Sequence, residues 1–441
     1  MSRESVVVMA DPWHPYAVEL ARRFFDEHGL RTVFFYEDAK EAFYAGGLAA
    51  HTQAWVAATR VVKVHEFPEF ARALRSDFVV AAVVPPSEAS LSRVTALMRH
   101  LNAGWCAPHT LERFRDKQAL KSFLEERAPH LRLGAGFRIN SSADLVALRA
   151  QLPSRFVLKP NDGFGNREVG FFNAASFDEA VKFVSGGAVS AWVLEPFIDG
   201  EEFAVNGQVD AQGAVHVFTV SRYERVAGNG RPNLYFREWS LTPSDPLFLK
   251  FAGYARAVLA HTDLRGSPFH LELKCDEEGP CLIEVGARLV GHAGAHVVND
   301  VCSGLDAFSI AARGYLGLPL EVPPIVDGPG FMVADGITTS EGFVSNLFGL
   351  DLVEQHPAFR RWVIKPRIGM KVRPTLSLFD IPWAAHFAGS PQALRDASST
   401  FETALRATVA SSSWDRLRLS AFDFARRGLR KAAWLAHRAT M

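Results

Sequence analysis

The chain has 441 residues, of which 48% are hydrophobic, enough for a sizeable core divided among two to four domain-sized units. Lysine and arginine together number 48, and aspartate and glutamate also number 48, so the formal net charge is zero. A chain without net charge has no global field that attracts nucleic acid or an anionic membrane, so we expect neither as a partner.

The N-terminal run Val6–Met9 is too short for the apolar core of a signal peptide, and no run of about 18 apolar residues predicts a membrane span. The four cysteines have neither C-x-x-C spacing nor histidines at zinc-ligand spacing; they are Cys106, Cys275, Cys281 and Cys302. This usage is typical of buried thiols in a reducing compartment, so we expect a cytoplasmic protein.

Strand-like and helix-like segments alternate through residues 5–110. We expect strands at Val6–Ala10, Arg31–Tyr36 and Phe78–Val84, and helices at Pro15–His28 and Ser90–Asn102. This alternation predicts a small parallel-sheet domain. Pro85-Pro86-Ser87-Glu88 follows the last of these strands, at the edge where open α/β sheets bind ligands, although a plain helix start is the simpler interpretation.

Helix-like and strand-like patterns continue through the middle of the chain. The expected helices are Asp116–Arg127, Ser176–Val184, Pro246–His261 and Ser303–Leu316. The expected strands are Phe156–Pro160, Val169–Asn173, Ala191–Pro196, Phe203–Val209 and Ala214–Arg222. Residues 226–246 are rich in Gly, Pro, Asn and Arg and predict a long mobile loop.

The C-terminal part divides into a β-rich stretch over residues 330–390 and a helical tail from Ser413. The tail carries seven lysines and arginines against two aspartates. A docked helix with a solvated basic face is the simpler interpretation, and binding to a membrane surface or a partner is the alternative.

The segments Phe269–Leu273 and Cys281–Arg288 read as two strands folded back on each other by the turn Asp276–Pro280. Each strand carries one carboxylate, Glu272 in the first and Glu284 in the second. Two carboxylates that face each other repel unless a cation lies between them, and Mg²⁺ is the natural candidate. The alternative is a surface hairpin with solvated acids.

Two further segments have features of a nucleotide site. Lys159 ends a strand and precedes a glycine-rich loop whose N–H groups could turn toward an anion, although an ordinary strand-to-loop junction would look the same. In Glu195–Phe203 a strand leads into a short connector and a turn with acids on both sides. Backbone N–H and C=O groups of the connector can bind adenine as a base-pairing partner would. A carboxylate past the turn can accept hydrogen bonds from the ribose hydroxyls. An acidic surface turn is the alternative.

In their order along the chain, these motifs resemble the ATP-grasp superfamily of carboxylate–amine ligases over roughly residues 105–320. The matching segments are Arg115–Leu120, Val157–Pro160, the glycine loop, Glu195–Phe203, His270–Glu272 and Ile283–Arg288. Within this superfamily, the chain most resembles the dipeptide-forming L-amino acid ligases. These have a similar sequence around the last acidic strand, which is followed here by Gly291-His292-Ala293-Gly294.

The resemblance implies an α/β (α+β) ATP-grasp fold with a Rossmann-like pre-ATP-grasp domain before it and a β-rich and helical extension after it. The implied parts are residues 1–110 (pre-ATP-grasp domain), 111–194 (small lid subdomain), 195–325 (large subdomain with the metal site) and 326–441 (C-terminal subdomain). Dimerisation is common in the family, so a homodimer is one expectation.

The resemblance also implies a role for each matching residue. Lys117 and Lys159 would hold ATP phosphates, Glu195 and the backbone of Phe197 and Ile198 would meet adenine, Glu202 would meet the ribose, Glu272 and Glu284 would ligate Mg²⁺ or Mn²⁺, and Arg288 would stabilise the transferred phosphate. His270 and His292 are candidate bases for the attacking amine. The chain departs from many members at Gly286, where Asn is usual, and at Asn166, where Ser is common.

The activity that the resemblance implies is the conversion of an amino acid carboxylate into an acyl phosphate, followed by attack of an amine to give an amide such as a dipeptide. Two outcomes within the fold, ATP-grasp carboxylation and thioester formation, are alternatives. A non-catalytic nucleotide-binding scaffold is the alternative from another class. It is disfavoured because a scaffold has no need of an arginine at the phosphoryl position.

Overall fold

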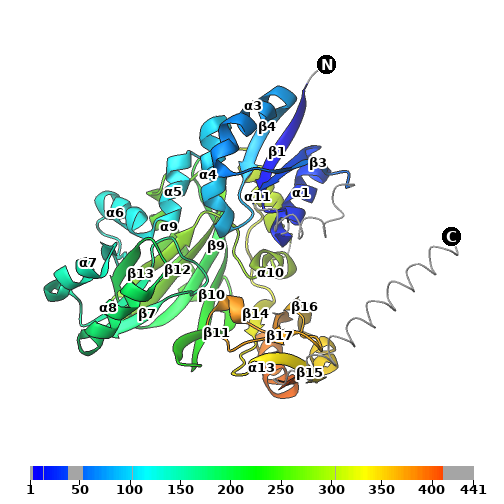
Figure 1. Cartoon of the computed structure of the whole chain (residues 1–441). Helices are drawn as coiled ribbons and strands as arrows, with labels where there is room; N and C mark the ends of the chain where they lie inside the picture. Colours follow the sequence, from blue (N-terminus) through cyan, green and yellow to red (C-terminus); the bar gives the residue numbers. More distant parts are fainter. Residues whose placement is uncertain (1–2, 13, 38–52, 102, 303, 411–441) are drawn as a thin grey trace. The chain divides into compact units, whose positions relative to one another are not determined.

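The computed structural model of the chain describes residues 3–12, 14–37, 53–101, 103–302 and 304–410 (Figure 1). Its backbone contacts divide the chain into two units. The first unit comprises Met1–Phe164, Glu168–Arg222 and Leu241–Gly328, and the second comprises Gly165–Arg167, Tyr223–Ser240 and Pro329–Met441. The four-part division expected from the sequence stays a prediction, and the basic tail lies outside the described residues.

The N-terminal part of the first unit is a parallel sheet in the order β3-β2-β1-β4. Its strands are β1 (Glu4–Ala10), β2 (Arg31–Tyr36), β3 (Val56–Val61) and β4 (Phe78–Val84), and its helices are α1 (Pro15–His28), α3 (Phe67–Asp77) and α4 (Leu91–Leu101). Alternate residues of β1 face opposite sides: Val6 and Val8 pack in one core with α3 and α4, and Val7 and Met9 in another with α1. The predicted parallel-sheet domain is confirmed.

A second sheet in the first unit is antiparallel, in the order β5-β8-β6-β7. Its strands are β5 (Phe137–Ile139), β6 (Arg155–Pro160), β7 (Gly170–Asn173) and β8 (Trp192–Pro196), and its helices are α7 (Ser142–Ala147) and α8 (Phe177–Gly186). Phe156, Leu158, Trp192 and Leu194 form its small core with apolar residues of α8. This sheet places Lys159 and Glu195 on neighbouring strands.

The third set of strands in the first unit runs β13-β12-β9-β10 and is antiparallel where β12 meets its two neighbours. The strands are β9 (Glu201–Val209), β10 (Val215–Gly228, whose residues from Tyr223 on belong to the second unit), β12 (Ser267–Asp276) and β13 (Gly279–Gly286). The helices of this part are α5 (Pro108–Arg115), α6 (Lys117–Arg127), α9 (Pro246–Ala260), α10 (Gly294–Val301) and α11 (Ala307–Tyr315).

The second unit contains the strand order β11-β14-β18-β16 after the end of β10, and a separate three-stranded sheet β17-β15-β19. The strands are β11 (Arg231–Ser240), β14 (Gly330–Asp335), β15 (Gly342–Phe348), β16 (Phe359–Ile364), β17 (Lys371–Val372), β18 (Ala384–Gly389) and β19 (Arg406–Ala410); the helices are α12 (Leu350–Glu354) and α13 (Pro391–Ala404). Leu394, Ala397 and Phe401 of α13 pack on Met332 and Phe387. The predicted β-rich stretch is confirmed.

The long loop predicted for residues 226–246 is wrong, because β10 and β11 are neighbouring strands joined by the two-residue turn Asn229-Gly230. Both turn residues have left-handed backbones, with φ of 50° and 73°. That combination is the turn that matches the twist of a two-stranded ribbon, and Asn-Gly is its usual sequence. The Asn229 amide also donates to the carbonyl oxygens of Thr338 and Thr375, each at 2.9 Å.

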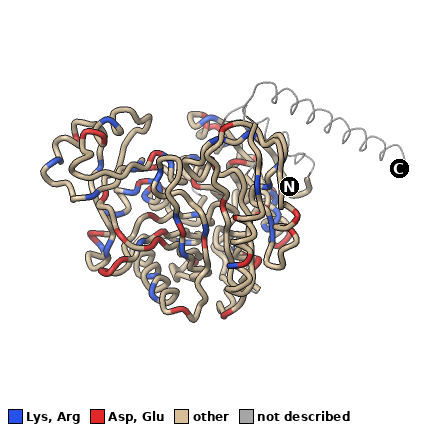
Figure 2. Tube along the Cα trace, turned by 90° about the horizontal axis from the view of Figure 1, so that it is seen from below, with Lys and Arg blue, Asp and Glu red and all other residues tan. Residues whose placement is uncertain are grey.

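Lysine and arginine positions are interspersed with aspartate and glutamate positions along the drawn trace (Figure 2), as the balanced composition leads one to expect. Among the described helices, none is both long enough and apolar enough to span a membrane.

Substitution of glycine by alanine should change stability in opposite directions in the β10–β11 turn and in α9. Gly230→Ala should lower the free energy of unfolding by about 1–2 kcal/mol, because alanine at φ 73° is strained. Gly253→Ala, in the interior of α9 with nothing within 4 Å of the added Cβ, should raise it by about 0.5–1 kcal/mol. Denaturant unfolding of both variants measures the pair; equal effects would contradict the assigned turn.

Candidate active site

Two glutamates face each other on the hairpin of β12 and β13. Glu272 is the direct partner of Glu284 in the antiparallel register, and His270 is the partner of Gly286. Directly opposed residues project from the same face of a sheet, so all four positions lie on one surface. The predicted juxtaposition of the two carboxylates is therefore confirmed.

A bulge lies next to this pair. The register passes from Glu272–Glu284 to Leu273–Leu282, which leaves Ile283 as an extra residue on β13. A bulged residue is not held in the regular ladder. The Ile283 carbonyl oxygen accepts a hydrogen bond from Lys159 Nζ at 3.3 Å, so the bulge ties β13 to the lysine of β6.

Glu195 is buried between two lysines. Its carboxylate oxygens lie 2.8 Å from Lys121 Nζ and 2.8 Å from Lys159 Nζ. Burial raises the pKa of Glu195, but the two ammonium groups outweigh burial and lower it. Burial also lowers the pKa of Lys121, whereas Glu195 and Glu284 outweigh burial at Lys159 and raise its pKa. Lys121 is a site residue that our interpretation of the sequence missed.

The start of α6 is anchored to the loop that follows Lys159. Asn161 is buried; its carbonyl oxygen accepts from the Lys117 N–H at 3.2 Å and its amide oxygen accepts from the Gln118 N–H at 3.1 Å. Asp116 caps the helix by accepting from the Ala119 N–H at 2.8 Å. Lys117 and Lys159, the two lysines predicted to hold phosphates, therefore lie on segments that are hydrogen-bonded to each other.

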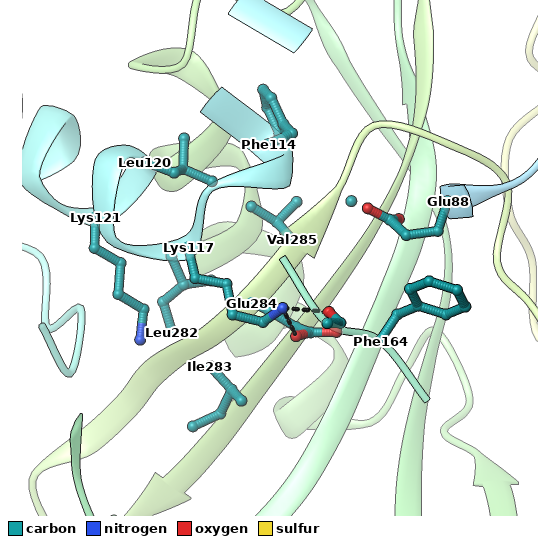
Figure 3. Close-up of a pocket in the computed structure, with 12 residues that line it drawn as sticks. Glu88, Phe114, Lys117, Leu120, Lys121, Phe164, Leu282, Ile283, Glu284 and Val285 are labelled. Atoms are coloured by element: carbon teal, nitrogen blue, oxygen red, sulfur yellow. Dashed lines mark hydrogen bonds and ion pairs between the residues drawn. The ribbon is translucent and has the colours of Figure 1, made fainter. Parts of the chain in front are cut away.

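Lys117 contacts the β12–β13 hairpin directly. Its Nζ lies 3.3 Å from Glu284 Oε2 and also donates to the Gly163 carbonyl oxygen in the glycine loop (Figure 3). Burial raises the pKa of Glu284, but Lys117, Lys159, Arg288 and His270 act in the opposite direction and lower it to about 2. Glu284 is therefore held as a carboxylate near neutral pH.

Lys117, Lys121 and Glu284 border a pocket in the first unit. Its lining residues come from the β4–α4 turn, α5, α6, the glycine loop and β13; they are Glu88, Phe114, Lys117, Leu120, Lys121, Gly163, Phe164 and residues 282–286. Figure 3 shows the Lys117 amino group directed at Glu284, with Glu88 entering from a separate element.

Arg288 follows β13 and is held by Glu88. Its Nε lies 2.8 Å from Glu88 Oε2, and its Nη1 donates to the Leu289 carbonyl oxygen at 3.2 Å. Arg115 contacts the other oxygen of Glu88 at 2.9 Å. The sequence pointed to the edge of the sheet at Glu88 but favoured a plain helix start, so the pairing with Arg288 was missed.

The two candidate bases differ in setting. His270 is buried, with Nδ1 at 2.6 Å from Asn206 Oδ1 and Nε2 at 3.2 Å from Glu272 Oε1. The Asn206 amide nitrogen donates to Thr219, which fixes its oxygen toward His270. His270 therefore orients Glu272. His292 lies in the turn before α10 with a left-handed backbone, φ 53°. The role of either ring as a base stays a prediction.

The connector expected to meet adenine is itself held in place. The Phe197 N–H donates to the Arg155 carbonyl oxygen at 3.0 Å, and the Ile198 carbonyl oxygen accepts from Lys274 Nζ at 2.9 Å. Lys274 is the register partner of Glu202 on β9. The adenine and ribose contacts assigned to Phe197, Ile198 and Glu202 stay predictions, as does the contact of Glu195 with adenine.

The donor set fits a hard divalent cation. Glu272 and Glu284 offer carboxylate oxygens from one face, and Mg²⁺ is usually held by one or two carboxylates together with substrate phosphates and water. In the part of the chain that the structure describes, no cluster of three or more His, Cys, Asp or Glu offers a metal cage. The protein would therefore contribute two ligands at this position.

Comparison with known proteins agrees with this geometry. Residues 152–296 match the family described as the ATP-grasp domain, and the resemblance and fold class predicted from the motifs are confirmed. The structure is similar over 93% of this chain, and all of the other, to an L-amino acid ligase from Bacillus licheniformis, with a TM-score of 0.75 and 21% sequence identity. It is also similar, with a TM-score of 0.65 and 12% identity over 92% of this chain and 100% of the other, to an N5-carboxyaminoimidazole ribonucleotide synthetase from Thermotoga maritima.

Among curated proteins, the chain is 30% identical over 124 residues to dapdiamide A synthase of Enterobacter agglomerans, which is 28% of each chain. The matched part of the chain spans about half or less of the length of the curated relatives it matches. At these identities the structural similarities establish the fold.

Removal of the Lys121 ammonium should destabilise the first unit. Lys121→Met leaves Glu195 buried with one cation instead of two, and breaking a buried pair typically costs 3–5 kcal/mol. Because Lys159 remains in contact, we expect a loss of about 3 kcal/mol in the free energy of unfolding. Lys182→Met, at an exposed lysine of α8, is the control and should change it by less than about 0.5 kcal/mol. Equal losses in the two variants would show that the ion pair of Lys121 with Glu195 does not contribute to stability.

The lowered pKa of Glu284 predicts an acid-dependent loss of stability. The folded pKa of about 2 lies below the ordinary value of 4.5, so the stabilising contribution is complete above about pH 4.5 and is lost as the pH falls toward 2. Between pH 6 and pH 3 the free energy of unfolding should fall by about 2 kcal/mol more in the wild type than in Glu284→Gln. Urea unfolding across this range measures the difference; parallel pH profiles would contradict the ion pairing.

Proposed function

We propose that this protein is an ATP-dependent ligase that activates an amino acid carboxylate as an acyl phosphate and joins it to an amine, that of a second amino acid, releasing ADP and phosphate. The observation that carries the proposal is one connected set of charged side chains. Lys117 and Glu284 line one pocket and lie 3.3 Å apart, and Glu272 is the register partner of Glu284. Lys159 bonds to the Ile283 carbonyl and Arg288 bonds to Glu88, and both of these partners line the same pocket. Two lysines, two acidic metal ligands and an arginine are the groups that phosphoryl transfer requires.

Each side chain has a task in this reaction. Lys117 and Lys159 bind the phosphates. Glu272 and Glu284 would hold Mg²⁺, which when bound would neutralise charge on the phosphoryl oxygens. A carboxylate oxygen of the first substrate attacks the γ-phosphorus while the bond to ADP breaks, and Arg288 stabilises the charge on the transferred group. The amine nitrogen then attacks the acyl carbon, phosphate leaves, and a base takes the ammonium proton.

The similarity to an L-amino acid ligase supports amino acids as substrates, and the match to dapdiamide A synthase supports the same class of ligase. The similarity to a carboxyaminoimidazole ribonucleotide synthetase keeps ATP-dependent carboxylation as the competing outcome of the same fold. Gly286, where many relatives in the superfamily have Asn, favours the amino acid ligases, which have a small residue there.

The deciding experiment is a screen of amino acid pairs with purified protein, ATP and Mg²⁺, followed by phosphate detection and mass spectrometry of the products. We expect phosphate release that depends on an amino acid pair, and a product mass equal to the two amino acids less one water. Glu284→Gln should lower turnover at least about 100-fold, because a metal carboxylate is lost. Glu277→Gln, at an exposed acid in the turn between the same two strands, is the matched control and should keep wild-type turnover.

Three results would contradict the proposal. Phosphate release that requires bicarbonate or a thiol in place of an amine would assign the protein to carboxylation or thioester formation. Tight ATP binding without phosphate release in any mixture would assign it to a nucleotide-binding scaffold. Wild-type turnover in Glu284→Gln would overturn the metal assignment.

A further inference from the structure

Glu88 stands at the first position of a short turn, Glu88–Ser90, just after β4, and reaches from there into the pocket. Its two carboxylate oxygens are divided between two guanidinium groups: Oε1 lies 2.9 Å from Arg115 Nη1 and Oε2 lies 2.8 Å from Arg288 Nε. All three side chains are at most 15% exposed. A carboxylate this well buried needs such partners, because desolvation of an unpaired charge costs several kcal/mol.

The contact fixes the orientation of Arg288. Nε is bound to Glu88 and Nη1 to the carbonyl oxygen of Leu289, so two of the three guanidinium nitrogens are held. Burial raises the pKa of Glu88, but Arg288 and Arg115 outweigh burial and lower it, so the carboxylate stays charged. Glu88 thereby provides a fixed anion behind the arginine.

Gly286 completes the arrangement. A Cβ at this position would lie 2.7 Å from Glu88 Oε2, and 3.4 and 3.5 Å from Nε and Cζ of Arg288. The backbone of Gly286 is not left-handed, so conformational freedom does not explain the glycine. Lack of space does, because any side chain here would push the carboxylate away from the arginine.

We propose that Glu88 is a positioning residue that holds the guanidinium of Arg288 for phosphoryl transfer, and that residue 286 is glycine because the Glu88 carboxylate occupies the space of its side chain. This inference rests on the proposed function for the role of Arg288. Glu88 itself acts through Arg288 and not through contact with substrate.

The test is a double-mutant cycle of Glu88→Gln and Gly286→Ala, with kcat and KM measured for ATP and for both amino acids. Each single variant should lower kcat about 10- to 100-fold and change each KM less than about 3-fold, as expected for loss of a transition-state interaction. The kcat of the double variant should be no lower than that of the less active single variant, because both changes break the same contact. Gly253→Ala is the matched control and should leave kcat unchanged.

Several results would overturn the proposal. Additive losses would mean that the two residues act separately, and a raised amino acid KM at unchanged kcat would place Glu88 against substrate. If Glu88→Gln does not fold, Glu88→Asp takes its place, since it keeps the charge but withdraws the carboxylate by one methylene. A crystal structure of Gly286→Ala tests the geometry even if the wild type shows no ligase activity: Arg288 should move while β12 and β13 stay in place, and an unmoved Arg288 would refute the inference.

Discussion

Buried negative charge that must be matched by positive charge is the constraint on which this site depends. Four carboxylates come from four elements: Glu88 and Glu284 line the pocket, and Glu195 and Glu272 are buried beside their partners. Each would cost several kcal/mol to bury alone. Glu88, Glu195 and Glu284 are paired with lysines or arginines of the first unit, and Glu272 lies 3.2 Å from the His270 ring. The pairs therefore tie the β4–α4 turn, α6, β6, β8 and the β12–β13 hairpin to one another.

Irregular backbone in the site follows from the same constraint. A regular β13 would keep the Ile283 carbonyl in the ladder, whereas the bulge makes it available to Lys159. Asn161 uses its own carbonyl and amide oxygens to satisfy the free N–H groups at the start of α6, so that Lys117 is carried to Glu284 on an anchored helix. The positions of the charges are thus set by backbone contacts made outside the pocket.

Local pattern accounts for most of what the sequence predicted correctly. Strands such as Phe78–Val84 and the helix Pro15–His28 were predictable because apolar periodicity and end signals act within a few residues. The opposed glutamates were predictable because one short turn fixes their register. The β10–β11 turn was missed although Asn229-Gly230 is a strong local signal, because a composition rich in Gly, Pro and Asn was read as a loop.

Lys121 and Glu88 were missed for a different reason. Lys121 lies four residues after Lys117, on a helix where a lysine is usually solvated, and only the approach of β8 makes it a buried partner of Glu195. Glu88 meets Arg288 across 200 residues of sequence. Neither contact leaves a periodic or short-range signal, so a single sequence cannot reveal it without the tertiary arrangement.

Gly286 is informative both in the sequence and in the folded chain. In the sequence, Gly286 lacks the side-chain oxygen that many members of the superfamily carry two residues after the acid that corresponds to Glu284. In the folded chain the same space is taken by a carboxylate from the β4–α4 turn, bound to the arginine of the site. The polar group in this space therefore comes from another element. The contact between Glu88 and Arg288 ties the end of β4 in the N-terminal sheet to the segment that follows β13, a link that a side chain on β13 would not provide.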